Sequence, residues 1–87
     1  DDALSYYERA YQLNAENAHT NFHIGMLYLD GIYKFNALPY LQKAYSLNPG
    51  IDKRIHLFLA MALHYDHQWQ DAIEQYQEAE KKMTKEE

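Results

Sequence analysis

The side chains best suited to binding chemistry in this sequence are its five histidines. His19 and His23 are four residues apart on one predicted helix, so their rings could share a face and a divalent ion. His64 and His67 are three apart at a predicted helix end. A closed zinc site needs four ligands, however, and the sequence has neither a cysteine nor the HExxH pattern. We therefore interpret the histidines as exposed or groove-lining residues and expect no metal site and no cofactor.

The sequence gives no indication of catalysis. Ser5 and Ser46 lie outside any Gly-x-Ser-x-Gly turn, there is no Gly-rich phosphate loop, and acid pairs such as Asp1-Asp2 lie at the chain ends. Binding to nucleic acid is disfavoured by the net charge of −5 and by the scattering of the eight basic residues. We expect that the chain is not an enzyme and does not bind nucleic acid.

The elements that position these residues are indicated by an internal repeat. The segments DALSYYERAYQLNAE, NALPYLQKAYSLNPG and DAIEQYQEAEKKM align without a gap, and each has an alanine, a bulky residue four positions later and a second alanine three after that. These triplets are Ala3, Tyr7, Ala10; Ala37, Leu41, Ala44; and Ala72, Tyr76, Ala79. Their first alanines stand 34 and then 35 residues apart, a period typical of helical repeat arrays. Such folds bind other proteins far more often than they catalyse.

Apolar residues at three-to-four spacing predict an all-α chain of five helices. No stretch alternates with period two, so a sheet is not expected. We expect Asn36 to cap the third helix and Pro39 to lie in its first turn, where the missing N–H breaks no intrahelical bond. The predicted helices cover about residues 2–14, 18–30, 36–48, 53–65 and 69–84.

The repeat resembles the tetratricopeptide repeat (TPR), a helix-turn-helix unit in which small residues let the paired helices pack closely. The resemblance implies helical hairpins stacked as an α-α superhelix. Its divisions would be helix B of a truncated first repeat (1–17), a full repeat (18–51) and a repeat with an extended C-terminal helix (52–87). Asn21 and His56 depart from the pattern, because the family prefers Trp or Leu there. The matching residues of the middle unit are Ile24, Gly25 and Tyr28 in helix A, Ala37, Leu41 and Ala44 in helix B, and Pro49 at its close.

The resemblance also implies that the A helices line a concave, partner-binding surface. Two methionines in this lining would suit more than one partner surface. The alternative is that the stripe is buried against neighbouring repeats or another chain. A chaperone-tail clamp is disfavoured, because only Arg54 is left where a clamp cation could sit. The expected inward residues are Phe22, Met26, Leu29, Leu57, Met61 and His64, flanked by His23, Phe58 and Asp30.

Two functions follow from this sequence. The first is a protein-interaction module that binds a peptide or helix of a partner in the groove and scaffolds a complex. The second is a structural spacer within a larger multidomain protein, with no ligand of its own. The first helix lacks a helix A partner and no polar capping helix follows the last, so we expect a fragment of a longer array that self-associates through its open ends.

The sequence constrains the cellular location of the protein less than it constrains the fold. No apolar run is long enough to span a membrane, so no membrane insertion is expected, and the absence of cysteine leaves cytoplasm and periplasm open. The segment ALPYLQKAYSLNPG with the following IDKRIHLFLAMALHYDHQWQDAIEQYQ resembles repeats that precede OmpA-like peptidoglycan-binding domains in Gram-negative envelope proteins. That resemblance implies a periplasmic location in the cell envelope and a secretion or gliding component as the partner.

Overall fold

The structure is a computed structural model that describes residues 2–31 and 34–84. The outer limits predicted for the first and last repeats, residues 1 and 87, lie outside the described residues, as do parts of the acid pairs at the two chain ends. Within the described part the fold is all-α, as predicted, and it has no strand. Its elements are α1 (Asp2–Leu13), α2 (Ala18–Asp30), a 3-10 turn η1 (Lys34–Asn36), α3 (Ala37–Leu47), α4 (Ile55–Tyr65) and α5 (Trp69–Thr84).

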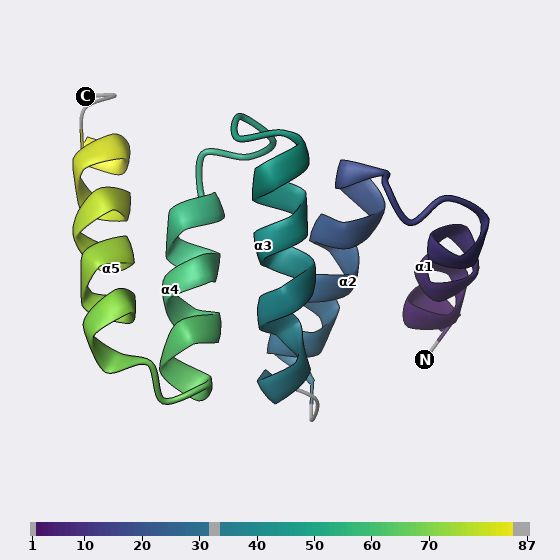
Figure 1. Ribbon diagram of the computed structural model, residues 1–87, viewed down its shortest axis with the longest axis horizontal. Coiled ribbons are helices and arrows are strands. Elements are labelled where there is room, and N and C mark those ends of the chain that lie inside the picture. Colours follow the sequence, from purple (N-terminus) through teal and green to yellow (C-terminus); the bar gives the residue numbers. More distant parts are fainter. Residues whose placement is uncertain (1, 32–33, 85–87) are drawn as a thin grey trace.

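The helices stand side by side in chain order, and successive helices run in opposite directions (Figure 1). The most extensive packing is between α2 and α3 and between α4 and α5, so the chain forms two helical hairpins. Helix α1 packs on α2, and α3 joins the two hairpins by packing on α4. Helix α2 also touches α4, which brings the first helix of each hairpin together on one side of the row.

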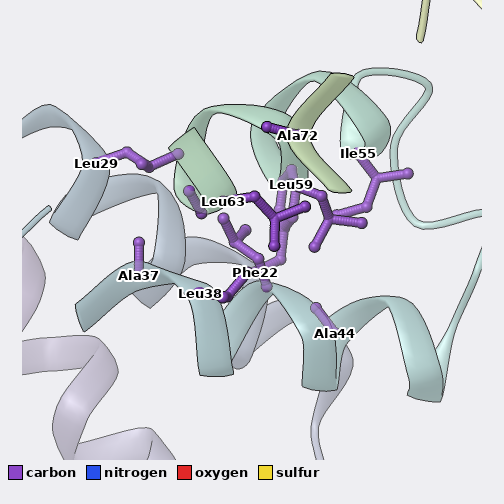
Figure 2. Close-up of a cluster of buried hydrophobic side chains, with 11 residues drawn as sticks. Phe22, Leu29, Ala37, Leu38, Ala44, Ile55, Leu59, Leu63 and Ala72 are labelled. Carbon is purple, nitrogen blue, oxygen red and sulfur yellow. The ribbon is translucent and has the colours of Figure 1, made fainter. Parts of the chain in front are cut away.

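The core lies between the two hairpins (Figure 2). Phe22 and Leu38 come from the first hairpin, and Leu59, Leu63 and Ile55 from the second. Each of these side chains is at most 7% exposed, so burial of apolar surface at this junction provides the main attraction between the hairpins. Helix α1 contributes no residue to this cluster.

The three repeated triplets occupy different environments. Ala37, Leu41 and Ala44 are fully buried, and Ala72 and Ala79 are almost so. In α1 the equivalent Ala3 is exposed, while Tyr7 and Ala10 are only half-buried. The burial of one sequence pattern thus decreases from the centre of the row to its N-terminal end, where α1 has a neighbour on one side only.

Each helix begins and ends within two residues of its predicted limits. One predicted helix cap needs correction. Asn17 caps α2, since its Oδ1 accepts a hydrogen bond of 3.0 Å from the Thr20 N–H. Asn36 stands at the start of α3 as predicted, but its side chain makes no capping hydrogen bond. The reason is its helical backbone (φ −94°, ψ −2°): the preceding turn η1 runs directly into α3, whereas a capping side chain needs an extended backbone at that position.

Candidate interaction groove

An apolar cleft of about 270 Å³ opens between α2 and α4. A second cleft of about 230 Å³ lies beside it, between α1 and α2, and is lined by Tyr7, His23, Met26 and Leu27. Because Met26 and Leu27 line both clefts, the two clefts form one continuous surface, which we call the groove. The lining of the first cleft is Met26, Leu27, Leu29, Asp30, Phe58 and Met61.

Helix geometry explains which side chains reach the groove. At about 100° per residue, His23, Met26 and Leu27 lie on one side of α2, and Phe22 and Leu29 lie at the border between that side and the core. Phe22 and Leu29 are accordingly only 4% and 6% exposed. Leu29 still forms part of the cleft wall, whereas Phe22 supports it from within the core.

The structure brings together most of the predicted partner-binding residues. His23, Met26, Leu29, Phe58 and Met61 line the groove. Phe22 lies beneath them, with its ring centroid 5.8 Å from that of Phe58 and 5.9 Å from that of His23.

Leu57 and His64 line neither cleft. His64 instead packs edge-on against Trp69, with ring centroids 5.1 Å apart, at the turn between α4 and α5. Leu57 is half-buried. Leu57 and His64 lie only about 40° and 60° around α4 from Met61, which does line the cleft, and the repeat pattern alone does not separate these positions.

Two lining residues were not among the predicted set. Leu27 follows Met26 directly and lies about 100° further around α2, so it forms the ridge between the clefts. Tyr7 belongs to the first repeated triplet. Its half-exposed position is explained by the weak coverage of α1, a property of the fold rather than of the local sequence.

The charges around the groove are few and mostly paired. Asp30 is the carboxylate in its lining. The guanidinium of Arg54 lies 5.2 Å from the centroid of the Phe58 ring and 3.0 Å from Asp52 through its Nε. Hydrogen bonding to Arg54 lowers the pKa of Asp52, which keeps this pair ionised and the cation engaged. Arg54 therefore already has a carboxylate partner in Asp52.

His23 is the polar side chain inside the groove. Its ring meets Tyr7 edge-on at 4.7 Å, and its Nδ1 is buried without a hydrogen-bond partner among the described residues. Burial, and secondarily the charge of His19, lowers the pKa of His23. The groove therefore holds a neutral imidazole at neutral pH, and its lining stays largely apolar.

The paired histidines form ring contacts. The ring centroids of His19 and His23 are 6.5 Å apart, and His67 packs on Trp69 at 5.2 Å. In the part of the chain that the structure describes, no three His, Asp or Glu residues lie close enough together to hold a metal ion.

A larger cleft, of about 450 Å³, lies against α1, α2 and α3, and its lining includes Tyr11, Tyr28 and Tyr40. The hydroxyl of Tyr28 donates a hydrogen bond of 3.1 Å to Glu8. Burial, followed by that hydrogen bond, raises the pKa of Tyr28 to about 12. The Tyr40 ring lies 5.5 Å from both Tyr11 and Tyr28, so the three rings tie α1 to the first hairpin.

Over the described residues, the chain is all-helical and has two shallow, adjacent apolar clefts beside α2. Comparison of the sequence with protein-family models and with curated proteins finds no match. Among the described helices, none has the length and apolar character needed to cross a membrane.

Proposed function

We propose that this chain is a protein-interaction module of the tetratricopeptide type, and that its groove binds a peptide or helix of a partner protein. The observation that carries the proposal is the cleft between α2 and α4, where Met26, Met61 and Phe58 are only partly buried. Apolar side chains that line a surface cleft without filling it are typical of sites that receive another protein's side chains.

The tetratricopeptide assignment is supported by the way the helices pair. Antiparallel hairpins α2/α3 and α4/α5 repeat along the chain, and their first helices touch each other. The paired helices α2 and α3 approach closely at Gly25, where an added Cβ would lie 2.6 Å from Leu41 Cγ. A small residue that lets two paired helices approach closely is the feature on which the sequence resemblance depends.

The dimensions and chemistry of the groove favour a helical or extended peptide with bulky apolar residues. Each of the two adjacent clefts has room for one or two side chains, and Met26 and Leu27 separate them. Methionine adapts its shape to different partner side chains, since it is unbranched and polarizable. Asp30 at the rim favours a lysine or arginine next to the apolar residues of the ligand.

The test is a selection of displayed peptides on the wild-type chain, followed by binding measurements with variants. Met26→Glu and Met61→Glu place carboxylates in the groove without disturbing fully buried residues. Phe22 is unsuitable for substitution, because it is 4% exposed and its loss would damage the core. Met83→Glu is the matched control, since Met83 is 41% exposed on α5 and lies outside the groove.

The proposal predicts that the selected peptides bind the wild-type chain and Met83→Glu equally, and the two groove variants at least about thirtyfold more weakly, as for an interface hot spot. Peptides that bind all four proteins equally would place binding elsewhere. A failure to select any peptide would favour the structural spacer.

A further inference from the structure

His23 is an ionisable side chain in the wall of the groove. Its ring meets that of Tyr7 edge-on in the cleft between α1 and α2, with the two centroids 4.7 Å apart. Met26 and Leu27 complete the lining of this cleft. A ligand that fills the cleft therefore lies against the imidazole of His23, so binding of the ligand is coupled to the charge on that ring.

The surroundings of His23 disfavour the protonated ring. In the protonated form both ring nitrogens carry a hydrogen atom that needs an acceptor. Nδ1 of His23 is buried, however, and has no hydrogen-bond partner among the described residues. The rings of Tyr7 and Phe22 pack against the imidazole, with centroids 4.7 and 5.9 Å away. Protonation would therefore leave a buried N–H without an acceptor, which costs free energy.

His19 and Asp30 share the side of α2 that carries His23. His19 lies one turn earlier, with its ring centroid 6.5 Å from that of His23, and its charge opposes a second positive charge there. Asp30 lies seven residues later, in the wall of the cleft between α2 and α4. About 10.5 Å of helix separate Asp30 from His23 at 1.5 Å per residue, so salt screens most of the attraction between them.

Among the described residues, the neighbouring elements place no counter-charge in contact with His23. Helix α1 places the phenol ring of Tyr7 against it, while the Glu8 carboxylate accepts a hydrogen bond from the Tyr28 hydroxyl. At the start of α4 the charge beside the groove is that of Arg54, which is also positive. Helix α3 and η1 contribute no residue to the described walls of either cleft.

We propose that the groove binds its ligand while His23 is neutral and releases the ligand when His23 is protonated. The inference rests on the proposed function, since it concerns the ligand of the same groove. An apolar ligand side chain in the cleft displaces water from the imidazole, and this loss of water disfavours the charged ring further. By linkage, a ligand that lowers the proton affinity of His23 is itself bound more weakly, by the same factor, when His23 is protonated.

The direction of the effect follows from the state of the empty groove. Burial, and secondarily the charge of His19, lowers the pKa of His23 from its ordinary value of 6.5, and a bound ligand lowers it further. Above about pH 6.5 His23 is neutral with or without ligand, so its titration does not affect the affinity. At lower pH the free chain takes up a proton more readily than the complex does, and the affinity decreases.

The test is the affinity of a selected peptide that contains no histidine, measured by calorimetry at pH 7 and pH 5 with helicity checked at both. The wild-type chain should bind the peptide at least about threefold more weakly at pH 5. His23→Gln keeps a neutral polar side chain at both pH values, so its two affinities should agree. His64→Gln is the matched control and should show the wild-type ratio, because His64 lines neither cleft.

Titration of the His23 ring by NMR measures the coupling from the side of the proton. The His23 resonances, identified by their absence in His23→Gln, should titrate at a lower pH in the complex than in the free chain. Three results would each overturn the inference and leave the groove as the binding site: a wild-type affinity equal at pH 7 and pH 5, the same pH dependence in His23→Gln, or a His23 titration that the peptide leaves unchanged. A chain that binds no peptide at either pH would overturn the proposed function, and this inference with it.

Discussion

Gly25 of α2 and Leu41 of α3 stand so close that a Cβ added to Gly25 would lie 2.6 Å from Leu41 Cγ and 2.7 Å from its Cδ2. Leu41 is fully buried, so it cannot move aside into solvent. This contact fixes the spacing of the first hairpin.

Gly25→Ala should therefore destabilise the chain by about 1–3 kcal/mol through overpacking, even though alanine is the better helix former by about 1 kcal/mol. Chemical denaturation with circular dichroism measures this directly. Gly50→Ala is the control, because an added Cβ there meets nothing closer than Asn48 Oδ1 at 3.8 Å. A Gly25→Ala variant as stable as the wild type would show that the hairpin is looser than the contact implies.

Asn21 fastens the loop between α1 and α2. Its side-chain amide donates hydrogen bonds of 2.9 Å to the carbonyl oxygens of Ala15 and Asn17, and the residue is 1% exposed. Asn21→Leu should cost about 1–3 kcal/mol of unfolding free energy, because the partly buried hydrogen bonds to these two carbonyls are lost. Asn36→Ala, where no side-chain capping bond exists, should change stability by at most about 0.5 kcal/mol. Equal losses in the two variants would contradict this role for Asn21.

His23 should make stability depend on pH. Its pKa is lower in the folded chain than in the unfolded chain, so on acidification the unfolded state takes up the proton first. The His23 contribution is fully present above about pH 6.5, the unfolded value, and is lost as the pH falls toward the folded pKa. His23→Gln should lose less unfolding free energy between pH 7 and pH 5 than the wild type does. Parallel pH profiles for the two proteins would refute the assignment.

His67 carries a left-handed backbone conformation (φ 63°) just after α4. Glycine adopts this conformation without steric cost, so His67→Gly should raise the unfolding free energy by about 0.5–1 kcal/mol. The gain is reduced by loss of the ring contact with Trp69. Thermal and chemical denaturation measure the net effect of the relieved backbone strain and the lost ring contact. His67→Ala separates these two effects, because it removes the ring and keeps the backbone strain. A drop in stability for His67→Gly would mean that the ring contact outweighs the strain.

Sequence periodicity was sufficient to predict the helices. All five appear, with ends shifted by at most two residues, because apolar spacing and turn-forming residues are local signals. The sequence showed that Asn21 and His56 depart from the repeat pattern, but it did not show which groups their side chains contact. Asn21 binds loop carbonyls, and the buried His56 places Nδ1 2.7 Å from Gln75 Oε1 of α5. Both partners are set by tertiary packing.

The groove was predictable only in outline. The sequence placed Met26, Phe58 and Met61 on one surface, and the structure places them around one cleft. It did not separate Phe22, which faces the core, from Met26, because the two differ by about 40° around α2. It also did not predict that four large apolar side chains of α5 (Trp69, Ile73, Tyr76 and Met83) remain exposed, since exposure depends on which helices have neighbours on both sides.

The most direct test of the central claim is the affinity of a selected peptide for the wild-type chain, Met61→Glu and Met83→Glu, measured by calorimetry with helicity checked in parallel. If the groove between α2 and α4 is the interaction site, the peptide should bind the wild type and Met83→Glu with equal affinity and should not bind Met61→Glu. All three proteins should be equally helical. Equal affinity for the two variants, or affinity lost only with Met83→Glu, would contradict it.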